Sequence, residues 1–107
     1  MAKYIYLYRG PDPAASNPTP EQSAERMAAF GAWMQRVGTA LVDVGSPFGT
    51  STSVRDDGTQ TTAGDLIGYS IIEADDLAAA KAFTDGLPFL SGNDGTCAVE
   101  IFELQAM

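Results

Sequence analysis

The stretch KYIYLYRG near the N-terminus constrains the fold more than any other part of the chain. Its three tyrosines share one face of an extended chain, and Ile5 and Leu7 share the other. Aromatic and β-branched residues that alternate with period two predict a β-strand. Because both faces carry large side chains, we expect helices to cover one face and a partner subunit to cover the other.

A helix is predicted from Pro20 to about Val37, because a capping motif precedes it and a glycine follows it. Thr19 and Gln22 form a Thr-x-x-Gln capping box, and proline suits the first helical position. Trp33 lies at the edge of the apolar stripe, where it packs at the border of the core or contacts a second subunit. The stripe itself has helical spacing and comprises Met27, Phe30, Met34 and Val37.

Further strands are predicted where apolar residues run together, at residues 39–45, 67–74 and 97–104. The first two of these runs are separated by a polar stretch, TSTSVRDDGTQTT, at residues 50–62. Its Asp57-Gly58 pair is typical of the turn of a β-hairpin. We therefore expect a hairpin between the second and third long strands.

A second helix is predicted over residues 76–86, with Asp75 or Asp76 as its N-cap. The proline-rich residues 10–20 are interpreted as a loop inside the fold. The resulting order, β-α-β-hairpin-β-α-β, predicts a single domain over residues 1–107, an α+β ferredoxin-like sandwich with both helices on one face.

The opposite sheet face is expected to carry the tyrosines of the first strand together with Phe102 and Leu104. Such a face is too apolar to remain in water. Two sheets packed face to face would form a dimeric α+β barrel, so we expect a homodimer.

Composition excludes several functions. The net charge of −8, from 14 acidic and 6 basic residues, disfavours nucleic acid and anionic membranes as partners. The chain has no histidine, which removes Ser-His-Asp and Cys-His chemistry and the commonest zinc ligand. Its one cysteine, Cys97, lies in an apolar run and is interpreted as a small buried side chain.

No nucleotide-binding or EF-hand motif is present, so neither a cofactor nor a metal is expected. The sequence also has no apolar run of about 18 residues and no signal-peptide pattern at its N-terminus. The expected location is the cytoplasm.

Asp43, in ALVDVGSPFGTS, is the most informative polar residue, because it interrupts an apolar strand. A carboxylate at such a place needs solvent or a partner. One interpretation has Asp43 accept backbone N–H groups of the turn at residues 45–49. The other makes it a general acid or base beside a pocket on the open sheet face. Arg9, which ends the first strand, is expected to pair with carboxylates such as Glu100.

Four segments, KYIYLYRGP, LVDVGSPFG, GYSIIEADDLAAAKAF and PFL…AVEIFEL, follow one another in an order that resembles the YCII-related proteins, in particular the DGPF-domain branch. The resemblance implies a dimeric α+β barrel and a small bacterial cytoplasmic protein. Some relatives act on small cyclic organic molecules, including by chloro-muconolactone dehalogenation. Members of the DGPF branch often lie beside genes for extracytoplasmic-function sigma factors.

In some relatives, a histidine of the first helix and an aspartate after the second strand are proposed as an active-site pair. The aspartate falls on Asp43, since DVGSPF is a spread-out form of the D-G-P-F word. The histidine would fall near Met27 and is missing here. This absence favours ligand binding over histidine-dependent catalysis.

Two functions lead, and a related barrel activity such as cofactor-free oxygenation, which no particular residue supports, is the remaining alternative. The first is a non-catalytic protein that binds a small organic ligand, with an accessory role in sigma-factor signalling. The second is a lyase, isomerase or dehalogenase that acts on a small organic acid or lactone. In the enzyme, Asp43 would be the base and Arg9 would hold an anionic group. The residues expected to line the pocket in either case are Tyr6, Tyr8, Phe48 and Tyr69.

Overall fold

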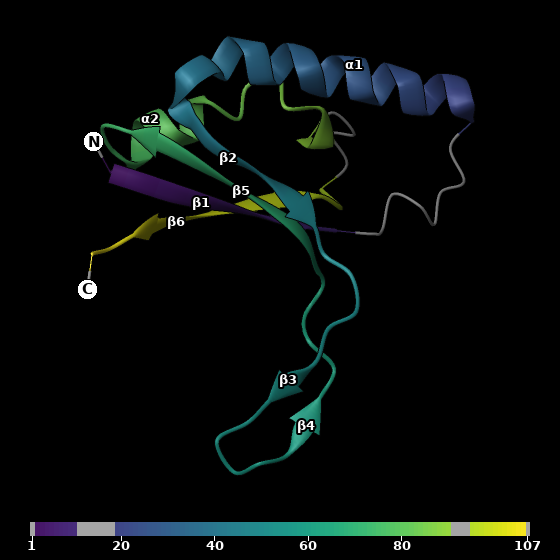
Figure 1. The fold of residues 1–107 in the computed structure, drawn as a ribbon, viewed down its shortest axis with the longest axis vertical. Helices are drawn as coiled ribbons and strands as arrows, with labels where there is room; N and C mark the ends of the chain where they lie inside the picture. Colours follow the sequence, from purple (N-terminus) through teal and green to yellow (C-terminus); the bar gives the residue numbers. More distant parts are fainter. Residues whose placement is uncertain (1, 11–18, 91–94, 107) are drawn as a thin grey trace.

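A computed structural model describes residues 2–10, 19–90 and 95–106 of the chain (Figure 1). Most of the loop predicted at residues 10–20 lies outside these described ranges. The elements, in chain order, are β1 (Ala2–Arg9), α1 (Pro20–Val37), the 3-10 turn η2 (Gly38–Ala40), β2 (Leu41–Pro47), β3 (Ser53–Val54), β4 (Gln60–Thr61), β5 (Leu66–Ala74), α2 (Leu77–Ala82), the 3-10 turn η3 (Pro88–Leu90) and β6 (Ala98–Leu104).

The four long strands form an antiparallel sheet in the order β2-β5-β1-β6. Helices α1 and α2 both pack on one face of this sheet (Figure 1). The mixed α+β architecture with an antiparallel sheet and two helices was predicted from the sequence and is consistent with a ferredoxin-like fold. The assembly of two such sheets into a barrel stays a prediction.

The tyrosines of β1 face the helices, which corrects the expectation that they lie on the open face. Tyr4 and Tyr6 are buried in the core with residues of α1 and α2. Ile5 lies opposite Ile71 of β5 and Phe102 of β6, so these three side chains share the open face. Period-two alternation fixes which residues share a face, but it does not say which face the helices cover.

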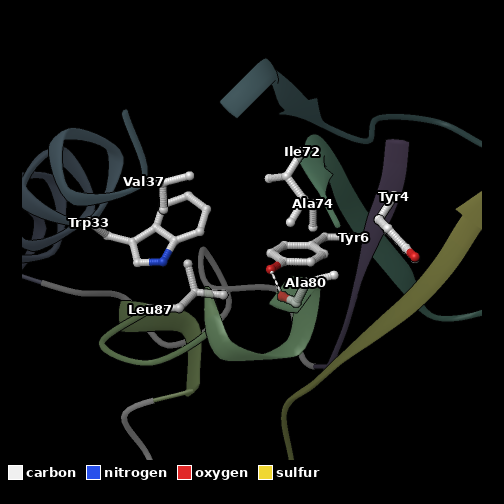
Figure 2. Packing of buried hydrophobic residues seen from close by; sticks show 8 residues of the cluster. All are labelled: Tyr4, Tyr6, Trp33, Val37, Ile72, Ala74, Ala80 and Leu87. Carbon is white, nitrogen blue, oxygen red and sulfur yellow. Dashed lines mark hydrogen bonds between the residues drawn. The ribbon is translucent and has the colours of Figure 1, made fainter. Parts of the chain in front are cut away.

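The core lies between the sheet and the helices (Figure 2), and two side-chain hydrogen bonds link it to the backbone of the helix layer. The Tyr6 hydroxyl donates to the carbonyl oxygen of Ala80 in α2. The indole N–H of Trp33 donates to the carbonyl oxygen of Phe83 at 2.7 Å. Trp33 is therefore a core residue, as the first of its two interpretations held. The core comprises Tyr4, Tyr6, Trp33, Val37, Ile72, Ala74, Ala80 and Leu87.

Helix α1 begins with the predicted capping box. The Thr19 hydroxyl accepts from the Gln22 N–H at 3.1 Å, and the Gln22 side chain accepts from the Thr19 N–H at 3.0 Å. The predicted apolar stripe is only partly right, because Met27 is 76% exposed. The N-terminal half of α1 reaches beyond the ends of the strands (Figure 1), so the stripe is half-buried at Phe30 and Met34 and fully buried only at Val37.

Two predicted boundaries are corrected. The second helix ends at Ala82 rather than at residue 86, and the chain continues to Leu87 through hydrogen-bonded turns. Its N-cap is Asp76, whose carboxylate accepts from the Ala79 N–H at 2.8 Å. The strand predicted at residues 39–45 begins two residues later, since Gly38–Ala40 forms a 3-10 turn.

The predicted hairpin is present and projects away from the sheet (Figure 1). Its strands β3 and β4 pair with each other as a separate two-stranded sheet. The turn closes through a 2.9 Å hydrogen bond from the Gly58 N–H to the Arg55 carbonyl oxygen, and Gly58 has a φ of 88°. The turn prediction at Asp57-Gly58 is confirmed. Among the described residues, no helix combines the length and the apolar character that a membrane crossing needs.

Candidate functional site

A pocket of about 560 Å³ lies where the ends of β2 and β5 meet α1 and η3. Phe30 of α1 and Phe89 of η3 contribute aromatic walls to it. Tyr8 contributes a third ring, which meets the Phe89 ring edge-on at a centroid distance of 5.3 Å. The lining consists of Tyr8, Gly10, Phe30, Val44, Gly45, Ser46, Pro47, Phe48, Gly49, Gly64, Asp65, Leu66, Ile67, Gly68, Tyr69, Ser70 and Phe89.

A short chain of hydrogen bonds provides the polar part of this pocket. The hydroxyl oxygens of Tyr8 and Ser70 are 2.8 Å apart, and the Ser70 hydroxyl donates to the Val44 carbonyl oxygen at 2.8 Å. Ser70 is completely buried. Burial raises the pKa of the Tyr8 phenol, so Tyr8 remains neutral at physiological pH. The lining is thus largely apolar, with this neutral hydroxyl pair on one wall and the carboxylate of Asp65 as its charged group among the described residues.

A β-bulge in β2 positions the Val44 carbonyl. Asp43 lies opposite Ile71 and Ser46 lies opposite Tyr69, so β2 carries one more residue than β5 over this interval. Gly45 has a φ of 78°, and a Cβ atom at this position would lie 1.7 Å from the Tyr69 carbonyl oxygen. Only glycine allows the two strands to approach this closely.

Asp43 combines features of both interpretations that the sequence left open. One carboxylate oxygen accepts from the Gly45 N–H at 2.9 Å, which is the expected turn chemistry. The other accepts from the Tyr69 hydroxyl at 3.3 Å. The charge of Asp43 raises the pKa of the Tyr69 phenol, so Tyr69 keeps its proton and acts as a donor. Asp43 is exposed and does not line the pocket.

The pair formed by Asp43 and Tyr69 lies at the pocket rim, on the open side of the sheet. Register places both residues on the face of Ile71, opposite to that of Ser70. Phe48 stacks on the Tyr69 ring at a centroid distance of 5.9 Å and also lines the pocket. At the rim, Phe48 and Tyr69 both line the pocket and stack on each other, and Tyr69 is hydrogen-bonded to the Asp43 carboxylate.

Arg9 and Tyr6 do not line the pocket. The guanidinium of Arg9 pairs with Asp65, and its Nε lies 3.1 Å from the Glu100 carboxylate. The expected ion pair with Glu100 is confirmed, and both acidic partners compete with any anionic ligand for this cation. Tyr6 is fully buried, and its hydroxyl binds Ala80 on the far side of the core.

Sequence reasoning missed Phe30, Ser70 and Phe89 as residues of the pocket. Ser70 had a detectable signal, because it is a polar side chain in the apolar strand IGYSIIEA and shares the face of Ile72. Phe30 and Phe89 gave none, since an aromatic residue in a helix or turn is usually part of a core. Among the residues that the structure describes, no three His, Cys, Asp or Glu side chains are grouped so that they could hold a metal ion.

These features define a class of small α+β proteins: an antiparallel sheet with two helices on one face and a pocket at one end. Residues 1–105 match the model of the YCII-related domain, and the chain belongs to this family. The DGPF branch stays a prediction.

One solved structure with a similar fold is 5-chloro-2-hydroxyhydroquinone dehydrochlorinase from Burkholderia phenoliruptrix, in complex with 2,5-dihydroxybenzoquinone. The TM-score is 0.56 with 20% sequence identity, over 98% of this chain and 94% of that one. At this identity the likeness concerns the fold. A search among curated protein sequences returns no significant match.

Proposed function

We propose that the protein binds a small organic molecule in the pocket between α1, β2, β5 and η3. The observation that carries this proposal is the composition of the lining. The lining has five aromatic residues, Tyr8, Phe30, Phe48, Tyr69 and Phe89, together with the hydrogen-bonded hydroxyl pair of Tyr8 and Ser70. Ligand pockets are typically apolar cavities of several hundred Å³ with a few polar groups that orient the ligand, and this pocket fits that description.

The proposal differs in one respect from the expectation formed on the sequence. A ligand pocket was expected on the open sheet face, among the tyrosines of the first strand. Because those tyrosines face the helices, the pocket with Tyr8 in its wall lies on the helix-covered side. On the open face, Asp43 and Tyr69 form a hydrogen-bonded pair at the rim of this pocket.

A thermal-shift screen with a library of small organic molecules tests the proposal, because a ligand of the native state raises the melting temperature. Stabilising compounds should lose most of their effect on the Phe30→Ala variant, which removes an aromatic wall. Met27→Ala is the matched control, since Met27 lies on the same helix outside the pocket lining. Compounds that stabilise both variants equally would place binding elsewhere and contradict the proposal.

The second candidate function is a lyase, isomerase or dehalogenase with Asp43 as the proton acceptor. The observation in its favour is the carboxylate of Asp43 at the pocket rim, held by Gly45 and Tyr69. The structural neighbour removes hydrogen chloride from a chlorinated hydroquinone, as its name states. In such a reaction here, Asp43 would take the proton as chloride leaves.

Release of chloride from 5-chloro-2-hydroxyhydroquinone tests this second function. The wild-type protein should release chloride faster than the buffer alone, and Asp43→Asn should not. Asn keeps the size of the side chain and one oxygen for the Gly45 N–H, so its fold should be unchanged. Equal chloride release by both proteins would exclude Asp43 as the base.

We also propose that the protein works as a cytoplasmic homodimer whose open sheet faces pack together. Support comes from apolar residues left in water on that face, where Phe102 is 54% and Leu104 is 41% exposed. The accessory role in sigma-factor signalling stays a prediction that depends on the resemblance to the DGPF branch.

A further inference from the structure

The direction of the hydrogen bonds in the pocket points to the chemistry of its ligand. We infer that the pocket selects neutral aromatic molecules with a hydroxyl group, and that this hydroxyl donates its proton to the Tyr8 oxygen. The inference rests on the proposed binding function and deepens it, because it names the ligand class.

The proton of each hydroxyl in the chain can be assigned. A carbonyl oxygen only accepts, so the single proton of Ser70 is directed to Val44. Ser70 then has only lone pairs to offer to Tyr8, which must donate its own proton to Ser70. The Tyr8 oxygen therefore faces a ligand as an acceptor.

The other side-chain donors of the described lining are also committed. The Ser46 hydroxyl donates to the Pro47 carbonyl oxygen at 3.1 Å, and the Tyr69 hydroxyl donates to Asp43. With Tyr8 and Ser70, these are all the hydroxyl groups among the lining residues. A ligand oxygen without a proton thus meets side-chain acceptors whose lone pairs repel it.

Charge disfavours an anionic ligand as well. The described residues that line the pocket include the carboxylate of Asp65 and neither lysine nor arginine. The nearby cation, Arg9, is already paired with Asp65 and Glu100. A carboxylate or phosphate would enter beside a negative charge without a free cation to balance it, whereas a neutral molecule avoids this cost.

The rings of the lining favour an aromatic body for this ligand. Phe30 and Phe89 approach the pocket from α1 and η3, and Phe48 closes it near the rim. Offset or edge-on contacts with such rings stabilise a bound aromatic group beyond the burial of its area. A para-substituted phenol supplies an apolar ring for these contacts. It also supplies a hydroxyl proton that the Tyr8 oxygen can accept.

Three matched probes test the inference by NMR titration of the 15N-labelled protein: 4-ethylphenol, 4-ethylanisole and 4-ethylbenzoate. They share the ethyl-substituted ring and differ in carrying a donor, an acceptor or a charge. We expect 4-ethylphenol to bind about fivefold more tightly than 4-ethylanisole, as one added hydrogen bond predicts. We expect 4-ethylbenzoate to bind most weakly.

Two variants locate the effect at the hydroxyl pair. Tyr8→Phe removes the acceptor and should abolish the preference for 4-ethylphenol over 4-ethylanisole. Ser70→Ala keeps the Tyr8 oxygen but frees its proton, so 4-ethylanisole should gain affinity. Tyr4→Phe, which removes a hydroxyl bonded to Glu103 outside the pocket, is the control and should keep the wild-type ratio.

The outcomes separate the inference from the function that it rests on. If none of the three probes shifts resonances of the lining residues, the inference is contradicted, and the thermal-shift screen of the library decides the binding function separately. If 4-ethylanisole or 4-ethylbenzoate binds to that lining as tightly as 4-ethylphenol, the pocket binds ligands but the inference is wrong. An unchanged probe preference in Ser70→Ala would also overturn the assigned proton direction.

Discussion

The two faces of the central strand β1 carry side chains of similar size but meet different surroundings. Tyr4 and Tyr6 are buried against the helices, where the Tyr6 hydroxyl finds a partner in α2. Ile5 and Leu7 lie on the other face, beside strands whose apolar residues remain partly in water. The difference shows that apolar side chains alone do not determine where the core forms, because a second layer, here the helices, has to cover them.

Polar atoms explain part of this asymmetry. A tyrosine hydroxyl removed from water needs a hydrogen-bond partner, and on the helix side Tyr6 finds one in α2 and the half-buried Tyr8 finds one in Ser70. The open face presents Phe102 and Leu104, whose side chains gain from burial against any apolar surface and need no hydrogen-bond partner. Such a face suits another apolar surface.

The largest expected effect is on the covered face. Trp33→Ala removes a buried ring and its 2.7 Å hydrogen bond to Phe83, and it should lower the free energy of unfolding by about 3–5 kcal/mol. Urea unfolding followed by circular dichroism measures this change. Phe102→Ala, on the open face, is the comparison and should cost clearly less at a concentration where the protein is monomeric. Equal losses would show that the two faces do not differ in this way.

The second effect is at the β-bulge of β2, where Asp43 lies on the open face and the Val44 carbonyl binds Ser70 of the covered face. Gly45→Ala should destabilise the protein by at least about 2 kcal/mol, because alanine is strained at a φ of 78° and its Cβ would strike the Tyr69 carbonyl. Gly31→Ala is the matched control, since a Cβ there meets nothing within 4 Å in the middle of α1. It should stabilise the protein by about 0.5–1 kcal/mol. If Gly45→Ala lowered the free energy of unfolding by much less than expected, β2 and β5 would be able to move apart at little cost.

Local patterns predicted most of the fold. The alternation in KYIYLYRG, the capping box at Thr19 and the Asp57-Gly58 turn each depend on neighbours a few residues apart, and all three are confirmed. Where the prediction was wrong, the missing information was tertiary. The exposure of Met27 depends on where the sheet ends, and the orientation of the β1 tyrosines depends on which face the helices cover.

The candidate site was predicted less completely for the same reason. Asp43, Phe48 and Tyr69 lie together at the pocket rim, and the two contacts that join them link residues far apart in the sequence. Tyr8 lines a pocket on the helix-covered side rather than the expected one on the open face, and its partner Ser70 comes from another strand. The charge of Arg9 made an ion pair predictable, but which carboxylates it meets, Asp65 and Glu100, depends on the order of the strands in the sheet.

The third effect tests what covers the open face. Phe102→Asp should raise the dissociation constant of the proposed homodimer by at least about tenfold, because a carboxylate would be buried in an apolar contact. Light scattering coupled to size-exclusion chromatography over a range of concentrations measures the mass. Leu77→Asp is the control, since Leu77 is exposed at the start of α2, on the helix side, and should leave the mass unchanged. A wild-type protein that is monomeric at high micromolar concentration would contradict the facing-sheet dimer.

The smallest effect concerns the covered face at high pH. Burial raises the pKa of the Tyr6 phenol above its ordinary value, so the unfolded chain loses this proton at lower pH than the folded one does. The stabilisation is complete below the ordinary pKa and is lost as the pH rises above it. Between pH 10 and pH 11, this one group should cost about 1 kcal/mol of the free energy of unfolding. Tyr6→Phe should be less stable at pH 7, because it cannot bind Ala80, and should lose less with rising pH. Parallel alkaline profiles for the two proteins, measured by urea unfolding, would show that the Tyr6 phenol ionises as readily in the core as in water.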